Sequence, residues 1–177
     1  MDKVNVCLIG SGRAGMIHAH NYIGSVPGGV IIAVCDPIAE TAKAAAAELG
    51  INKWYQNYED VLKDEYINAV IIACPTNYHK DIVVAAAKAK KHIFCEKPMA
   101  MNVTECDEMI NAAEENGVKL QIGFMRRFDE SFKAAKKIIE DGEIGEIVLV
   151  KSQTRGPSKP KEWMLDIEKS NGPLAEV

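Results

Sequence analysis

The 177-residue sequence has no apolar run approaching the ~20 residues of a membrane-spanning helix, which excludes a transmembrane segment of that kind. It also has no low-complexity segment. The first three residues lead directly into an apolar run, so we expect neither a signal peptide nor a transit peptide. The resulting prediction is a cytoplasmic protein that does not contact a membrane.

An excess of charge of one sign is missing too, because the formal net charge is only −4. The charge balance therefore does not indicate a nucleic-acid partner or an anionic membrane surface. The five cysteines are an odd number without a C-x-x-C pair, which argues against a disulfide framework and a metal site of the zinc type. Four of them lie in or at the end of apolar runs and are expected to be reduced core residues: Cys7, Cys35, Cys74 and Cys95.

What is present is the composition of an ordinary globular protein, with 47% hydrophobic and 26% charged residues. The length allows one domain and part of a second. The most informative stretch is the apolar run Val4–Ile9, which ends in Gly-x-Gly-x-x-Gly and is followed by an expected helix, Arg13–Ser25. This order is typical of the turn that binds a dinucleotide, and a glycine-rich turn without a ligand is the alternative.

Each glycine of this pattern has its own physical role. Gly10 permits the tight turn, Gly12 allows the backbone to approach a pyrophosphate, and Gly15 allows the helix to pack closely on the strand. The phosphates would lie on the helix N-terminus at Arg13 and Ala14, where unpaired N–H groups and the helix dipole favour anions. The turn therefore predicts a dinucleotide cofactor.

A second apolar run, Val30–Cys35, ends at Asp36, which stands 21 residues after Gly15. A carboxylate at about this spacing accepts hydrogen bonds from the ribose hydroxyls of a bound dinucleotide. Because Pro37 suits the first helical position, Asp36 could also cap the next helix, and the two roles are compatible. No Arg or Ser follows to bind a 2′-phosphate, so NAD is favoured over NADP, although Lys43 leaves NADP open.

Strand-like and helix-like segments continue to alternate up to residue 124. The expected strands after Asp36 are Trp54–Tyr55, Ala69–Cys74, His92–Cys95 and Lys119–Phe124, and the expected longer helices begin near Pro37, Tyr78 and Asn102. Asn102 and Glu105 have the spacing of a capping box, and Gly117 marks the end of that helix. The alternation predicts an α/β fold with a doubly wound parallel sheet, a Rossmann domain over residues 1–124.

One loop at the end of a predicted strand is a candidate part of the site. Open parallel sheets bind ligands at the carboxyl edge of their strands. The loop that follows the strand Ala69–Cys74 should therefore face the cofactor, and it contains Pro75, Thr76, Asn77 and His79. A second short segment, Glu96, Lys97 and Pro98, follows the strand His92–Cys95.

The pattern changes at Met125, and residues 125–177 are predicted to be the incomplete start of a second, α+β domain. They contain an expected helix, Glu130–Ile139, and an expected strand, Ile147–Gln153, outside the alternating pattern. A lone strand has unpaired edges and does not form a stable domain. We therefore predict that the sequence is a truncated version of a longer chain.

Four motifs together resemble the Gfo/Idh/MocA family of NAD(P)-dependent oxidoreductases, particularly its inositol 2-dehydrogenase-like members. They occur in the family's order and span nearly the whole sequence: Gly10–Gly15, Pro75–His79, Glu96–Pro98 and Gly123–Asp129. Glu-Lys-Pro after a fifth strand is quite specific, whereas the glycine motif alone is not. The resemblance implies an enzyme that oxidises a ring hydroxyl of a cyclic polyol or sugar with NAD.

The resemblance also implies roles for individual residues. Lys97 would reach both the nicotinamide ribose and the substrate hydroxyl, and Pro98 would follow a cis peptide bond that orients this lysine. The alternative for Lys97 is a surface lysine at a strand end. Arg126 or Arg127 would donate to the substrate, although this pair could instead neutralise the two acidic residues at the start of the next helix.

Three histidines carry weaker expectations. His79 would lie near the nicotinamide by resemblance, but a polar loop histidine is often incidental. Glu96 belongs to the cofactor site together with the rest of its motif. His18 and His20 of the first expected helix have no partner apparent in the sequence, and we interpret them as structural.

The resemblance is incomplete at the end of the sequence. Family members carry Gly-Gly-x-x-x-Asp-x-x-x-His, in which the acid orients the substrate and the histidine removes the hydroxyl proton. Residues 170–176 match the beginning of this motif, with Glu176 in the acid position, and the sequence stops at Val177. We therefore predict that the chain carries the cofactor half and lacks the general base that catalysis requires.

The leading functional prediction is an NAD-dependent oxidoreductase that transfers hydride from a ring hydroxyl carbon to nicotinamide, with Lys97 and Glu176 as catalytic residues. One alternative is a non-catalytic NAD-binding module whose second-domain strand pairs with another subunit. Another is an NAD-dependent glycosidase on the same scaffold. Members of the family that the sequence resembles commonly pair through the sheet of the second domain. We therefore expect the complete enzyme to be a homo-oligomer, and we expect the 177-residue chain to be mostly monomeric or aggregation-prone.

Overall fold

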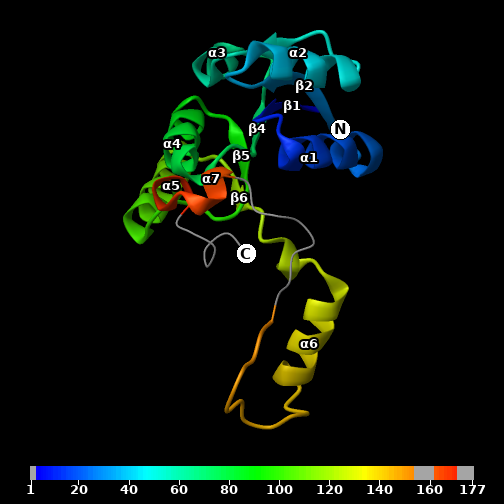
Figure 1. Cartoon of the computed structure of the whole chain (residues 1–177), viewed down its shortest axis with the longest axis vertical. Helices are drawn as coiled ribbons and strands as arrows, with labels where there is room; N and C mark the ends of the chain where they lie inside the picture. Colours follow the sequence, from blue (N-terminus) through cyan, green and yellow to red (C-terminus); the bar gives the residue numbers. More distant parts are fainter. Residues whose placement is uncertain (1–2, 154–161, 171–177) are drawn as a thin grey trace.

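The structure, a computed structural model, describes residues 3–153 and 162–170. Its centre is a six-stranded sheet in the order β3-β2-β1-β4-β5-β6 (Figure 1). Every neighbouring pair of strands is parallel. This order confirms the predicted doubly wound sheet, because the strand order reverses between β1 and β4. The strands are β1 (Val4–Ile9), β2 (Gly29–Cys35), β3 (Trp54–Tyr55), β4 (Ala69–Ile72), β5 (His92–Cys95) and β6 (Leu120–Ile122).

Helices cover both faces of the sheet. One face packs against α1 (Arg13–Ser25) and α2 (Ala39–Glu48), and the other packs against α3 (Tyr58–Lys63), α4 (His79–Lys88) and α5 (Val103–Asn116). Side chains alternate between these two layers along each strand. In β1, Val6 and Leu8 therefore join the α1–α2 core, whereas Cys7 and Ile9 join the α3–α5 core.

The ends of α5 form as the sequence predicts. The Asn102 side chain accepts a hydrogen bond from the Glu105 backbone N–H at 2.9 Å, and Gly117 ends the helix with φ of +66°. The reciprocal bond differs from that of an ideal capping box, because the Glu105 carboxylate accepts from the Met101 N–H at 3.0 Å. The capped N-terminus places the loop that follows Pro98 firmly at the end of β5.

The four cysteines that the sequence assigns to apolar runs lie in the apolar layer on the α3–α5 side of the sheet. All five are free, and Cys7, Cys35 and Cys95 are fully buried. Burial raises the pKa of both Cys35 and Cys74 to about 12. Because reactivity requires the thiolate, these thiols are inert core groups near neutral pH.

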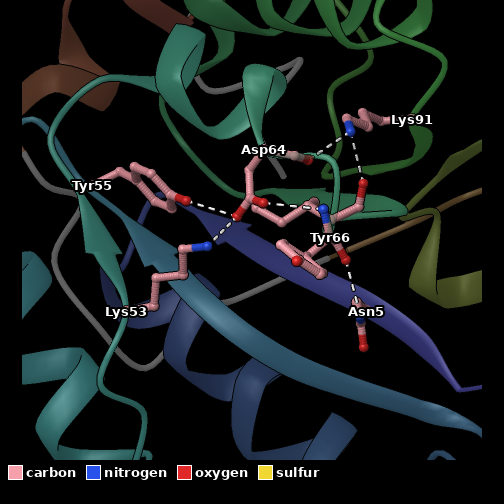
Figure 2. Close-up of polar contacts among 7 residues, drawn as sticks. Asn5, Lys53, Tyr55, Asp64, Tyr66 and Lys91 are labelled. Atoms are coloured by element: carbon pink, nitrogen blue, oxygen red, sulfur yellow. Dashed lines mark hydrogen bonds and ion pairs between the residues drawn. The ribbon is translucent and has the colours of Figure 1, made fainter.

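A polar network around Asp64 joins the loop after α3 to the neighbouring elements (Figure 2). The Asp64 carboxylate accepts hydrogen bonds from Lys53, from the Tyr55 hydroxyl at 2.8 Å and from the Tyr66 N–H at 3.0 Å. The buried Lys91 ammonium donates to the Asp64 carbonyl and to a second backbone carbonyl, both at 2.8 Å. The network thereby fixes the crossover from α3 to β4.

Residues 125–153 extend away from the sheet (Figure 1). This segment passes through the short helix η2 (Met125–Arg127) into α6 (Glu130–Glu140), whose N-terminus is capped by Asp129. The expected strand at residues 147–153 is wrong, because this stretch has neither helix nor strand and Val148 is 94% exposed. A strand is stable only when a neighbour satisfies its backbone groups, and no partner strand lies beside it in the part of the chain described.

Two short helices follow in the second described range. They are α7 (Glu162–Leu165) and α8 (Ile167–Ser170), and α8 lies against the short helix η1 (Thr76–Tyr78) that follows β4. Within residues 3–153 and 162–170, no helix is long and apolar enough to cross a bilayer. The same residues contain no group of three or more His, Cys, Asp or Glu side chains that could hold a metal ion.

Candidate cofactor-binding site

The carboxyl ends of the parallel strands bring the predicted site residues to one edge of the sheet. The glycine turn follows β1, Asp36 follows β2, the loop at Pro75 follows β4 and Glu96 follows β5. These four strands are adjacent in the sheet, so their ends lie side by side. Ligands bind at this edge in doubly wound folds because the strand order reverses there.

The three glycines of the turn differ in their surroundings. Gly10 has φ of +91°, and a Cβ on it would lie 2.7 Å from the Ala73 carbonyl oxygen. A Cβ on Gly15 would lie only 1.9 Å from the Gly10 carbonyl oxygen, so glycine is required for α1 to pack on the turn. A Cβ on Gly12, in contrast, would meet no atom within 4 Å among the residues described. The fold therefore requires Gly10 and Gly15, whereas Gly12 keeps the backbone open to a ligand.

The N-terminus of α1 has features that favour a nearby anion. Gly12 is its N-cap residue and supplies no side-chain hydrogen bond, and the first turn contains no acidic residue. Arg13 and Ala14, which begin the helix, are both exposed. The first N–H groups of a helix have no partner within the helix and carry the positive end of its dipole. A pyrophosphate at this position would meet these donors and the Arg13 charge.

Asp36 is tied to the glycine turn. One carboxylate oxygen accepts from the Ser11 N–H at 3.1 Å and from the Ser11 hydroxyl at 3.0 Å, and the other accepts from the Ile38 N–H at 3.0 Å. The predicted capping role is wrong, because α2 begins at Ala39 with Ile38 as its N-cap residue. A carboxylate has about four acceptor positions, and Asp36 uses three of them, so one remains for a ribose hydroxyl. Sequence reasoning missed Ser11, although a hydroxyl residue between two turn glycines was the available signal.

Lys43 is the residue that kept NADP as an alternative cofactor in the sequence analysis. In the structure, its ammonium already has partners. Its ammonium lies 3.0 Å from a Glu40 carboxylate oxygen and 5.2 Å from the centre of the Trp54 ring. A hollow of about 390 Å³ between α1 and α2 is lined in part by Ser11 and Glu40. A 2′-phosphate near Asp36 would therefore approach carboxylates, which disfavours a second anion.

The loop after β4 contains an unsatisfied acceptor and a buried histidine. The Asn77 side-chain oxygen is buried without a hydrogen-bond partner among the residues described. Buried polar atoms are normally paired, so this oxygen fits a donor supplied by a ligand. His79 is 1% exposed, and its two ring nitrogens lie 2.9 Å from the Pro98 carbonyl and 3.0 Å from the Cys74 carbonyl. It connects the two loops, and its predicted contact with the cofactor stays a prediction.

The Glu-Lys-Pro segment has the backbone geometry that the family resemblance implied. The peptide bond between Lys97 and Pro98 is cis. The Glu96 carboxylate accepts from the Lys97 N–H at 2.9 Å and, through its other oxygen, lies 2.6 Å from a ring nitrogen of His18. Sequence reasoning missed this partner of His18. His20, the other histidine of α1, lies 2.7 Å from an exposed Glu48 carboxylate oxygen.

The predicted substrate residues lie at the start of the second segment. Arg126 is exposed, lies 3.8 Å from an Asp129 carboxylate oxygen and stacks over the Phe132 ring at 5.1 Å. This ion pair is the alternative role that the sequence analysis gave for Arg126, the neutralisation of an acidic residue at the start of the next helix. Arg127 is exposed as well. Glu176, the predicted catalytic acid, lies outside the described residues.

This arrangement agrees with a comparison of the sequence with known families. Residues 4–124 match the oxidoreductase family Gfo/Idh/MocA, which has an NAD-binding Rossmann fold. The chain belongs to this family.

Two relatives of this chain with similar sequences are inositol dehydrogenases. The scyllo-inositol 2-dehydrogenase (NAD(+)) of Bacillus subtilis is 42% identical over 158 residues, which cover 89% of this chain and 46% of that protein. The myo-inositol 2-dehydrogenase of Thermotoga maritima is 36% identical over 157 residues, covering 89% of this chain and 47% of that protein. This chain therefore spans about half the length of the curated relatives it matches.

Solved structures of the family show the same fold. Myo-inositol 2-dehydrogenase from Lactobacillus plantarum superposes with a TM-score of 0.77 at 35% identity, covering 83% of this chain and 44% of that chain. Scyllo-inositol dehydrogenase from Lactobacillus casei, with bound cofactor NAD(H) and scyllo-inositol, has a TM-score of 0.77 at 29% identity, covering 82% and 43%. The Rossmann fold of this chain is thus that of enzymes crystallised with a nicotinamide cofactor.

Proposed function

We propose that residues 1–124 bind NAD and form the cofactor domain of a dehydrogenase that oxidises a ring hydroxyl of inositol or a related polyol or sugar. Residues 125–177 are then the start of the substrate and oligomerisation domain. The observation that carries this proposal is the open backbone at Gly12, set at the same sheet edge as Asp36 and Lys97. The names of the similar inositol dehydrogenases support the substrate class.

Different residues at this edge bind different parts of the cofactor. The N–H groups at Arg13 and Ala14 receive the pyrophosphate, and Asp36 accepts a hydrogen bond from the adenosine ribose. The buried Asn77 oxygen is the acceptor left over for a cofactor donor. NAD bound in this way would supply the hydride acceptor for the reaction.

Lys97 is the residue of this chain that we assign to the chemistry. Its ammonium would lie near the reacting oxygen, where it stabilises the negative charge that develops as hydride leaves the carbon. Arg126 or Arg127 would donate to the substrate hydroxyls, and Glu176 would orient the substrate. Turnover also needs a general base, which the family motif places after Glu176.

We also propose a cytoplasmic location and a homo-oligomeric complete enzyme. The apolar side chains of α6 support the assignment of this helix to an interface, because Phe132, Ile138 and Ile139 are exposed. The 177-residue chain should itself be mostly monomeric or prone to aggregation. Exposed apolar surface of this kind is typical of a contact region whose partner is missing.

Titration calorimetry of the purified chain with NADH tests the proposed function. We expect one cofactor per chain and a Kd between about 1 µM and 1 mM, which corresponds to roughly 4–8 kcal/mol of binding free energy. The substrate domain is not required for this signal, because the proposed contacts all lie within residues 1–124. The absence of binding at millimolar NADH would contradict the proposal.

Asp36→Ala should change the cofactor preference. Removing a charged hydrogen-bond acceptor costs about 1.5–3 kcal/mol, so NADH affinity should fall roughly 10- to 100-fold, whereas NADPH affinity should fall less or rise. Parallel titrations with NADH and NADPH measure the ratio. Asp107→Ala, at an exposed position on α5, is the control that should leave both affinities unchanged. An equal loss of affinity for NADH and NADPH would show that Asp36 does not distinguish the ribose hydroxyls from a 2′-phosphate.

A further inference from the structure

The Glu96 carboxylate connects helix α1 to the backbone of Lys97. One oxygen lies 2.6 Å from the Nε2 atom of His18, and the other accepts from the Lys97 N–H at 2.9 Å. Both side chains are mostly buried, with 27% of His18 and 22% of Glu96 exposed. A carboxylate held at both oxygens has little freedom to rotate, so the position of His18 determines where Glu96 can hold the Lys97 amide.

The surroundings leave room for this carboxylate and little else. The His18 ring packs edge-on against Phe94 with 5.1 Å between ring centres. A Cβ on Gly123 would lie 3.2 Å from the Glu96 carboxylate oxygen that faces His18 and 3.1 Å from the Phe94 ring. Residues from α1, β5 and the end of β6 therefore enclose Glu96. Its orientation is a product of tertiary packing and not of the local Glu-Lys-Pro sequence alone.

The charge of Glu96 strengthens both contacts. Burial raises the pKa of this carboxyl, but the hydrogen bonds from His18 and from the Lys97 N–H outweigh burial and hold the pKa below its ordinary value of 4.5. Glu96 is consequently ionised near neutral pH. Hydrogen bonds to an ionised acceptor are shorter and stronger than neutral ones.

We propose that His18 is a positioning residue for Lys97, acting through Glu96. This inference rests on the proposed function, since it assigns His18 a role in the cofactor site to which Lys97 belongs. In this view, α1 binds the pyrophosphate with its first turn and orients the Glu-Lys-Pro segment with its second. Loss of His18 would free the Glu96 carboxylate to turn, and the Lys97 N–H would lose its charged acceptor.

The amide resonance of Lys97 in the ¹⁵N-labelled chain reports this bond directly. In the wild-type chain, we expect a downfield amide proton with slow hydrogen exchange. His18→Ala should shift this proton upfield and speed its exchange by about ten-fold or more, as expected for loss of a local constraint. The Ile93 amide lies in β5, the strand before Lys97, and donates to the carbonyl of Lys119, the residue before β6; it should keep its shift and its exchange rate. His18→Gln, which restores a neutral donor, should recover part of the wild-type shift.

His20→Ala is the matched control, because His20 lies on the same helix and pairs with an exposed carboxylate far from Lys97 in sequence. It should leave the Lys97 amide unchanged. An unchanged Lys97 amide in His18→Ala would overturn the proposal, as would equal shifts in His18→Ala and His20→Ala or a matching change at Ile93. The first result would mean that His18 does not hold the Lys97 amide, and the other two would mean that it acts only on general stability.

NADH titration of the same variants separates the inference from the proposed function. If wild type binds NADH, His18→Ala should raise the Kd several-fold while His20→Ala does not, and an unchanged Kd in His18→Ala would overturn the positioning role. If wild type fails to bind NADH, the proposed function fails, and the Kd comparison between variants cannot be made. The amide measurement then still decides whether His18 holds Lys97 through Glu96.

Discussion

Gly15→Ala should abolish the cooperative unfolding transition of the chain or lower its stability by more than about 3 kcal/mol, because overpacking of this kind forces backbone to move. The new Cβ would lie 1.9 Å from the Gly10 carbonyl oxygen and 3.3 Å from a Leu8 methyl carbon. Alanine favours a helix over glycine by about 1 kcal/mol, so any loss comes from this clash. Urea denaturation followed by circular dichroism measures it.

Gly12→Ala is the matched control for Gly15→Ala. Its Cβ meets no described atom within 4 Å, and Gly12 has a φ of −69° that any residue adopts. Stability should fall by no more than about 1 kcal/mol, the difference between glycine and alanine at an N-cap. NADH affinity should nevertheless fall, because the methyl group occupies the approach of the pyrophosphate. A wild-type unfolding midpoint for Gly15→Ala, or wild-type NADH affinity for Gly12→Ala, would contradict the roles given to these glycines.

Asp64→Ala should lower stability by about 2–4 kcal/mol, since it removes the charged acceptor that three hydrogen bonds share. The Asp64 side chain is only 8% exposed and accepts from Lys53, Tyr55 and the Tyr66 N–H (Figure 2). Asp60→Ala is the control, because its carboxylate is 56% exposed and pairs only with Lys63 on the same helix turn among the described residues. Such exposed pairs contribute about 0.5 kcal/mol or less. Equal losses in the two variants would contradict the importance of the network.

The pH dependence of this effect has a defined direction. Burial raises the pKa of Asp64, but the hydrogen bonds from Lys53, Tyr55 and the Tyr66 N–H outweigh it and hold the pKa below the ordinary value of 3.8. The folded chain therefore binds this proton more weakly than the unfolded chain. The stabilisation from Asp64 is fully present above the unfolded pKa and is lost as the pH falls through the folded pKa. The stability difference between wild type and Asp64→Ala should be constant near neutral pH and shrink in acid, as urea titrations at several pH values would show.

Much of the Rossmann fold follows from local patterns. The apolar run before Gly10, the spacing to Asp36 and the cap at Asn102 each restrict a few consecutive backbone angles or the face that a segment buries. Those restrictions hold wherever the segment sits in space. The strand order β3-β2-β1-β4-β5-β6 then follows from short right-handed connections. The expected strand at residues 147–153 failed for the complementary reason, because a strand depends on a neighbour that local sequence does not provide.

The candidate site also combines features that local sequence determines with features that depend on tertiary packing. By itself, the sequence determined the glycine turn, the carboxylate after β2 and the position of Lys97 at the end of β5, because each depends on residues close together in the chain. Only the tertiary structure decided that Ser11 holds Asp36, and that His18 reaches Glu96 across 78 positions of sequence. Such pairs depend on how α1 lies across the sheet and on the register of the strands beneath it. Side-chain packing over the whole domain sets both, so no single stretch of sequence reveals them.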